Sequence, residues 1–174
     1  RHPESTSQRY QINVKLPPAD HGNCNSLLFV YLFREEYTEM DDILKKLKYR
    51  EQERIAVLNA PRKFLGRITR LLPGVQIDSE INARFLYDFM IAFTPGSAEV
   101  DKYGPACIHN LSEDGKLWMV YPKSSSRRYK SNINRNRGWE TVTNTGFKPV
   151  GQVAIDEDWS ALRFRNVKFI KNGK

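Results

Sequence analysis

Three short segments of this sequence are almost continuously apolar. They span residues 54–58 (RIAVL), 87–93 (YDFMIAF) and 117–121 (LWMVY). A strand of this kind has to be covered on both faces, which is how parallel strands are patterned when helices pack on each side of the sheet. The three segments therefore predict a layered α/β domain, with residues 87–93 near the centre of its sheet.

Segments with helical spacing lie between these strands. After the first strand, Asn59-Ala60-Pro61 supplies a capping side chain and a proline near the first helical position. One apolar stripe follows, made of Phe64, Leu65, Ile68, Leu71 and Leu72. Pro73-Gly74 ends that helix, and residues 75–81 are predicted as a second strand with Val75, Ile77 and Ile81 facing one way. So short a connection requires parallel pairing with a right-handed crossover.

The second half of the chain continues the alternation. A helix is predicted from the spacing of Val100, Tyr103, Cys107, Ile108 and Leu111, although Gly104-Pro105 should kink or split it. Asp114-Gly115 is predicted to turn the chain into the strand at 117–121. Another helix is expected around 134–145, with Trp139 and Val142 inward and Gly146 as its cap.

The last two predicted strands, 149–155 and 161–167, are joined by Asp156-Glu157-Asp158. This turn is too short for a helix, so the two strands should pair antiparallel. The complete order predicts a doubly wound, mostly parallel sheet of about five to six strands with a C-terminal antiparallel hairpin.

The domain is expected to occupy residues 40–174, after an N-terminal arm at 1–39. The arm is polar and rich in proline up to Asn25, and Ser26 to Phe33 could add one edge element. A second hypothesis is that residues 1–39 are translated upstream sequence, because Arg34-Glu35-Glu36 can be encoded by a purine-rich run resembling a ribosome-binding sequence. Met40 would then be the natural start of a helix with an acidic first turn, in which Ile43, Leu44 and Leu47 share one face.

Charge is distributed unevenly along the chain. The sequence contains 28 Lys and Arg residues against 20 Asp and Glu, a net charge of +8, and 24 of the basic but only 15 of the acidic residues follow from Met40 onward. A positive field raises encounter rates with phosphates, polyanions and acidic proteins. Solubility alone explains the excess equally well, so charge indicates no particular ligand.

Other features indicate a cytoplasmic location. The longest apolar run, Leu27 to Phe33, is far shorter than the ~20 residues that span a bilayer, and residues 1–30 do not have the pattern of a signal peptide. Two cysteines, Cys24 and Cys107, do not form a disulfide framework in a chain of this size. We expect Cys107 to be a buried thiol.

Three motifs in order resemble a known bacterial family. They are Leu44-Lys-Lys-Leu-Lys-Tyr leading to Arg54-Ile-Ala-Val-Leu-Asn-Ala-Pro, then Asp114-Gly-Lys-Leu-Trp-Met-Val-Tyr-Pro-Lys, then Val153-Ala-Ile-Asp-Glu-Asp-Trp-Ser-Ala-Leu-Arg-Phe. Together, over about Met40 to Lys171, they resemble the domain-of-unknown-function 3052 family of uncharacterised proteins. The resemblance implies no activity. The basic insertion after Lys123 departs from the family's usual pattern.

The strand order ending in a hairpin also looks like the Rossmann-like fold of class I methyltransferases, which bind S-adenosylmethionine. Those proteins carry a glycine-rich loop after the first strand, so that the backbone can approach the cofactor. Here the turn is Asn59-Ala-Pro-Arg-Lys-Phe-Leu-Gly, and its single Gly66 falls inside the helix. Asp78, near the end of the second strand, stands where the resemblance implies a ribose-binding carboxylate. A solvated strand-end carboxylate is the alternative interpretation.

In open parallel sheets, ligands bind beyond the carboxyl ends of the strands. This rule selects five candidate ligand-binding residues, which are Asn59, Asp78, Thr94, Lys123 and Ser124. Asn59 is also a plain helix cap. Lys123 and the serines after it could hold a phosphate by charge and hydroxyl donors, or form a solvated loop.

Residues 123–137 contain six Lys or Arg residues and no acid. With Tyr129 between them, they could track a phosphate backbone and stack on a base, which makes five residues candidates for binding nucleic acid or other anions: Arg127, Arg128, Lys130, Arg135 and Arg137. A flexible cationic loop is the alternative. No spacing of His or Cys suits a metal, and no serine lies in a nucleophile turn, so no metal and no catalytic residue is proposed from the sequence.

The sequence thus favours a non-catalytic binding or regulatory protein for a small anionic or nucleotide-like ligand. An S-adenosylmethionine-dependent methyltransferase is one alternative, and a nucleic-acid-associated protein that uses residues 123–137 is another. No membrane partner is expected, and nothing in the sequence indicates an oligomeric state.

Overall fold

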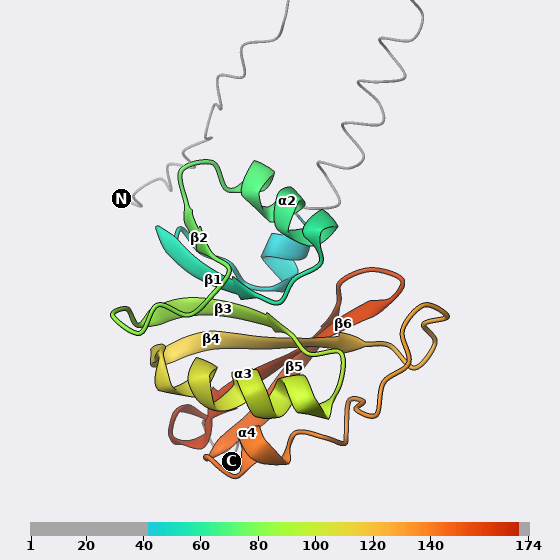
Figure 1. Ribbon diagram of the computed structural model, residues 1–174. Coiled ribbons are helices and arrows are strands. Elements are labelled where there is room, and N and C mark those ends of the chain that lie inside the picture. Colours follow the sequence, from blue (N-terminus) through green and yellow to red (C-terminus); the bar gives the residue numbers. More distant parts are fainter. Residues whose placement is uncertain (1–41, 171–174) are drawn as a thin grey trace, which may run out of the picture.

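The computed structural model describes residues 42–170, so the predictions for residues 1–39, including the hypothesis on the natural start, lie outside the described residues. Its centre is a six-stranded sheet in the order β2-β1-β3-β4-β6-β5 (Figure 1). The strands are β1 (Arg54–Leu58), β2 (Gln76–Asp78), β3 (Tyr87–Phe93), β4 (Leu111–Pro122), β5 (Phe147–Ala154) and β6 (Trp159–Asn166). The helices are α2 (Arg62–Leu71), α3 (Ser97–His109) and α4 (Glu140–Thr143), with a 3-10 turn at Val167–Phe169.

Strand pairing confirms the predicted fold class. β1 pairs in parallel with β2 and with β3, and β3 pairs in parallel with β4. The hairpin of β5 and β6 is antiparallel, and β6 also pairs antiparallel with β4. The bounds of β1 and β3 agree with the prediction because both segments are buried on both faces of the sheet. β3 and β4 occupy the two central positions.

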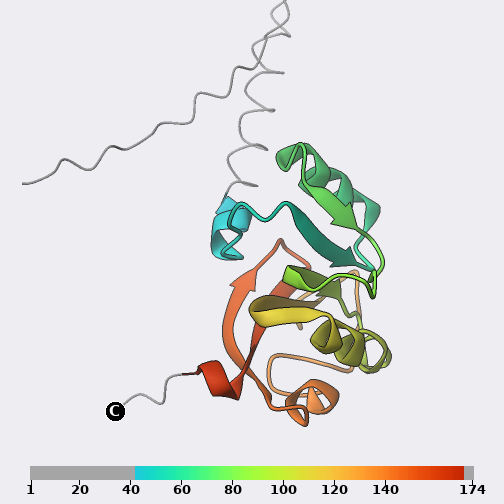
Figure 2. The same cartoon turned by 90° about the vertical axis from the view of Figure 1, so that its left-hand side faces the viewer.

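Helices lie on both faces of the sheet (Figures 1 and 2), and each face carries its own apolar layer. On one face, α2 and the helical residues 42–46 with the turn after them pack through Phe64, Ile68 and Leu47 against alternate residues of β1, β3 and β4. The indole Nε1 of Trp118 in β4 donates to the carbonyl of Leu47 at 2.9 Å and ties this layer to the sheet. On the other face, α3 and α4 cover the remaining residues of the same strands.

The second layer holds the predicted buried thiol. Cys107 lies on α3 and is fully buried, and burial raises the pKa of its thiol to about 12. Gly104, one turn earlier, lets α3 approach α4, because a Cβ at this position would lie 2.9 Å from Cγ2 of Val142. Pro105 stands inside α3, and the helix is not split there.

Four local predictions are wrong. β2 has only three residues, and Ile81 packs on the opposite apolar layer from Val75 and Ile77 because the strand ends at Asp78. Asp114-Gly115 lies within β4, where a register shift against β3 absorbs the extra residues. Two helix predictions also fail.

The helix predicted over 134–145 is only α4, since the backbone bridges Asn134 to Arg137 and Gly138 adopts a φ of +91°. Trp139 and Val142 are nevertheless buried, as predicted. Asn59 does not cap α2, whose first turn follows Pro61 without a side-chain cap. No helix among residues 42–170 is both long and apolar enough to cross a membrane.

Candidate functional site

The carboxyl ends of β1, β3 and β4 meet at one edge of the sheet, where Asn59, Thr94 and Lys123 directly follow the strands. Asn59 is exposed, has a φ of +52°, and donates from Nδ2 to the carbonyl of Phe93 at 2.9 Å. Thr94 is fully buried, and its hydroxyl donates to the carbonyl of Val120 at 3.1 Å. Both side chains therefore join neighbouring strand ends to each other.

Asp78 ends β2 and is held by several donors. Nε of Arg54 lies 2.6 Å from its Oδ2, the hydroxyl of Tyr87 lies 2.5 Å from the same oxygen, and Nε2 of Gln76 lies 3.2 Å from Oδ1. Burial acts to raise the pKa of this carboxyl, but the hydrogen bonds from Arg54, Tyr87 and Gln76 outweigh it and hold the pKa below its ordinary value. The carboxylate of Asp78 is therefore hydrogen-bonded within the protein. It is not the solvated strand-end carboxylate that the sequence offered as an alternative.

Residues 123–137, which we call the basic segment, begin at Lys123. This residue anchors the segment to the tip of the β5–β6 hairpin. Its backbone N–H donates to the carbonyl of Asp158 at 2.7 Å, and its Nζ donates to the carbonyl of Asp156 at 2.5 Å. The hydroxyl of Ser126 donates to Oδ1 of Asp158 at 2.7 Å. Part of the charge of Lys123 is thus used within the protein.

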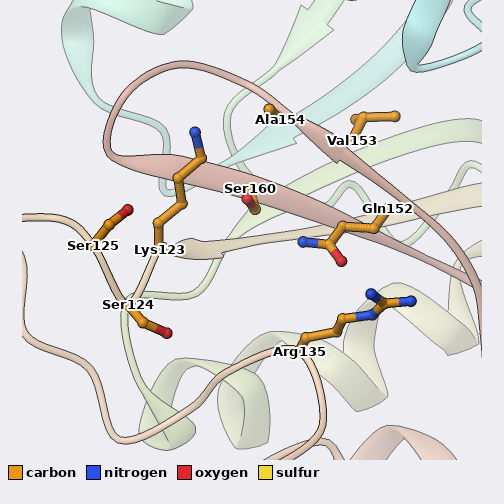
Figure 3. A pocket seen from close by; sticks show the side chains of 8 residues that line it. All are labelled: Lys123, Ser124, Ser125, Arg135, Gln152, Val153, Ala154 and Ser160. Atoms are coloured by element: carbon orange, nitrogen blue, oxygen red, sulfur yellow. The ribbon is translucent and has the colours of Figure 1, made fainter.

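Beside this anchor lies an open hollow of about 720 Å³ (Figure 3). It is lined by residues from the end of β4, the basic segment and the hairpin, which are Lys123, Ser124, Ser125, Arg135, Gln152, Val153, Ala154 and Ser160. Arg135 reaches in from the segment above α3, while Gln152 and Ser160 approach from the hairpin (Figure 3). The hollow joins Lys123 and Ser124 to Arg135, which the sequence had placed in a separate group of candidates.

Hydrogen-bonding groups surround this hollow. Nε2 of Gln152 donates to the hydroxyl of Tyr121 at 3.0 Å. Burial raises the pKa of Tyr121, against the opposing effects of the Arg135 charge and a hydrogen bond with Ser160. The lining itself supplies hydroxyls, an amide and two cations, which suit an anion with several oxygen atoms because each oxygen can accept from a different donor.

The remaining cations of the basic segment do not enter the hollow. Arg127, Arg128, Lys130 and Arg137 are all exposed. Tyr129 stacks on Trp159 with ring centroids 4.7 Å apart, so its ring serves the apolar layer. The aromatic platform predicted for a nucleic-acid base is therefore already occupied within the protein.

Sequence reasoning missed Gln152 and Ser160. Both belong to the antiparallel hairpin, and no motif links them to Lys123 along the chain. The rule that selects the carboxyl ends of parallel strands does not reach β6, whose amino end lies at this edge. Among residues 42–170, no group of three or more His, Cys, Asp or Glu side chains comes together to hold a metal ion.

Comparison with solved structures identifies the fold. An N-methyltransferase, NodS from Bradyrhizobium japonicum WM9 in complex with S-adenosyl-l-homocysteine, matches with a TM-score of 0.50 and 14% identity, over 77% of this chain and 87% of that chain. The chain has a Rossmann-like fold, which it shares with this N-methyltransferase. The glycopeptide N-methyltransferase MtfA is similar over 75% of this chain and 96% of its own, with 7% identity and a TM-score of 0.49. No protein-family model and no curated protein sequence matches the chain.

Proposed function

We propose that this protein is an S-adenosylmethionine-dependent methyltransferase-like protein that binds its adenosyl ligand at the carboxyl ends of β1 and β3. The observation that supports this proposal is the sheet itself, in which β6 is inserted antiparallel between β4 and β5, in a chain similar to NodS in complex with S-adenosyl-l-homocysteine. Ligands of such sheets bind where helix amino ends and strand carboxyl ends converge.

Asp78 is the carboxylate that this fold offers to a ribose, and in this chain it is paired with Arg54. A ribose hydroxyl has to compete with that guanidinium for the same oxygens. The turn at Asn59 also lacks glycine, so the backbone approach to the ligand depends on the left-handed conformation of Asn59. Both features favour weak binding of an adenosyl ligand.

The test is titration of the full chain with S-adenosyl-l-homocysteine, followed by thermal unfolding and calorimetry. Binding to the native state raises the melting temperature by mass action, with about 2.7 kcal/mol of stabilisation at 100 times the Kd. Asp78→Ala should weaken binding at least tenfold, whereas Asp114→Ala, which removes another salt-bridged carboxylate, should leave it unchanged. Unchanged melting at millimolar ligand would exclude the proposal.

A second candidate function is non-catalytic binding of a small anion in the hollow beside Lys123. It is supported by the convergence of Arg135, Gln152 and Ser160 on that space. Thermal unfolding with citrate and inorganic phosphate tests it through a matched pair of exposed arginines. Arg135→Gln should abolish the anion-dependent shift and Arg137→Gln should preserve it. Equal shifts in the two variants would rule the hollow out.

A further inference from the structure

A second concentration of positive charge lies on the sheet, away from the carboxyl edge. Trp118 and Arg163 are direct partners across β4 and β6, so their side chains lie on the same face. Lys116 precedes Trp118 by two residues, and Arg165 follows Arg163 by two, which places both on that face as well. Lys116 and Lys123 stand about 23 Å apart along the chain of β4, at ~3.3 Å per residue.

Only one of these cations has a counter-ion within the described part of the chain. Arg165 forms a two-pronged pair with Asp114, with Nε–Oδ1 and Nη2–Oδ2 distances of 2.6 and 2.5 Å. Lys116 and Arg163 form no salt bridge between residues 42 and 170. Moreover, Nε of Arg163 is buried and has no hydrogen-bond partner. A buried donor without a partner destabilises the folded protein, so this arrangement is incomplete.

The charges in this cluster also oppose one another. Burial lowers the pKa of Lys116, and the charges of Arg50 and Arg163 lower it further, while the carboxylates of Asp88 and Asp114 offset part of this effect. Burial likewise lowers the pKa of Arg163, with a further contribution from Arg165 that Asp114 partly offsets. An anion placed among them would reverse both effects, because an opposite charge at short range favours the ionised form of a cation.

Space for such an anion exists beside Arg163. Its partner on the other side, across β5 and β6, is Gly151. A Cβ built on Gly151 would meet no atom within 4 Å, and the backbone of Gly151 is not left-handed. The absence of a side chain there leaves room on the β5 side of Arg163, and a rotation of the flexible arginine stem would bring its buried Nε into that room.

We propose that Lys116 and Arg163 form a binding site for a phosphate group in the space beside Gly151. Arginine suits this ligand because its Nε and Nη donors form a planar fork that matches two phosphate oxygens, while lysine adds a point charge. The site lies toward the β5 edge of the sheet, away from the β2 and β1 edge, and it is independent of adenosyl binding at the carboxyl ends of β1 and β3.

The test is calorimetric titration of the full chain with inorganic phosphate, pyrophosphate, adenosine monophosphate and adenosine, in a buffer free of other polyvalent anions. Lys116→Gln combined with Arg163→Gln should weaken pyrophosphate binding at least tenfold. Arg127→Gln combined with Arg128→Gln removes the same net charge from the basic segment. This pair should change the affinity for pyrophosphate less than twofold. Equal weakening by the two pairs would refute the site, because the general field alone would then account for binding.

Tighter binding of adenosine monophosphate than of phosphate would assign a nucleotide, and equal binding would assign free phosphate. Adenosine, which lacks the phosphate, should not bind here. S-adenosyl-l-homocysteine also lacks phosphate, so its failure to bind would not argue against the phosphate site. Likewise, failure of pyrophosphate to bind would not argue against adenosyl binding at the carboxyl ends of β1 and β3.

Gly151→Glu provides a gain-of-charge test that does not rely on deleting cations. The new carboxylate should pair with Arg163, raise the melting temperature relative to Gly151→Gln, and reduce pyrophosphate affinity at least tenfold. Gly151→Gln introduces nearly the same volume without the charge and should retain most of the affinity. Full pyrophosphate affinity in a folded Gly151→Glu variant would overturn the proposal.

Discussion

The carboxylate of Asp78 shows how one ionised group can depend on its neighbours. Its pKa in the folded protein is below the ordinary value of 3.8, because donors from Arg54, Tyr87 and Gln76 outweigh its burial. A depressed pKa stabilises the folded state fully above pH 3.8, and this stabilisation is lost as the pH falls through the folded value.

We therefore expect Asp78→Asn to lower the melting temperature at pH 7 and to differ less from the native chain at pH 3. Thermal unfolding at the two pH values measures this difference. Tyr87→Phe removes one hydrogen bond to the ionised carboxylate and should cost about 1.5–3 kcal/mol at pH 7. If Asp78→Asn lowered the melting temperature by as much at pH 3 as at pH 7, Asp78 would not have the lowered pKa described here.

Cys107 carries a second prediction at this scale. With a thiol pKa of about 12 and no exposed surface, it should be inert to Ellman's reagent at pH 8 in the native protein. In a Cys24→Ser background, which leaves only this thiol, we expect one equivalent to react in denaturant and almost none without it. If the folded Cys24→Ser variant reacted rapidly with Ellman's reagent, α3 would either open readily or pack differently around Cys107.

Single residues also show where sequence reasoning succeeds for a site. Asn59, Thr94 and Lys123 could be assigned to one edge because each directly follows a parallel strand, and parallel strands end together. Tyr129 could not be assigned, since its stacking on Trp159 depends on a fold-back over thirty residues. The sequence likewise could not show that Nε of Arg163 lacks a hydrogen-bond partner, because this depends on how β4, β5 and β6 lie side by side.

At the scale of elements, two helical glycines have opposite surroundings. A Cβ on Gly66 of α2 would meet no atom within 4 Å, whereas one on Gly104 of α3 would lie 2.9 Å from Val142. Gly66→Ala should therefore stabilise the protein by about 0.5–1 kcal/mol through helix propensity. Gly104→Ala should destabilise it by about 1–3 kcal/mol through overpacking.

Chemical denaturation of both variants measures these changes, and Val142→Ala combined with Gly104→Ala should recover part of the loss. If Gly104→Ala were as stable as Gly66→Ala, α3 and α4 would not be in close contact.

Elements that pack on both sides were the most predictable. β1 and β3 are short, apolar throughout and flanked by turns, so their bounds follow from composition alone. The segment before α4 was mispredicted as helix because its apolar spacing suggested one. Gly138, with a φ of +91°, breaks that helix, and a Cβ there would lie 2.3 Å from Cγ2 of Ile133. Such a tertiary constraint leaves no periodic signal in the sequence.

At the scale of the whole molecule, two groups of cations lie apart from each other, the basic segment at the carboxyl ends of the parallel strands and the Lys116–Arg163 cluster on the sheet. The segment offers exposed cations without a free aromatic ring, because Tyr129 is packed against Trp159. Electrostatic attraction without stacking gives nucleic-acid binding that is weak, insensitive to sequence and steeply dependent on salt.

We propose that the segment binds single-stranded nucleic acid in this manner. The triple change of Arg127, Arg128 and Lys130 to Gln should reduce the slope of log K against log salt by about 2, since each phosphate contact contributes ~0.7 for single strands. Fluorescence anisotropy with a labelled oligonucleotide between 50 and 200 mM salt, concentrations over which such binding falls steeply, measures this slope. The double change of Lys116 and Arg163 should leave the slope nearly intact, because those cations lie on β4 and β6 and not in the basic segment. A triple variant with the native slope would show that the segment makes no phosphate contacts, and its excess charge would then serve solubility.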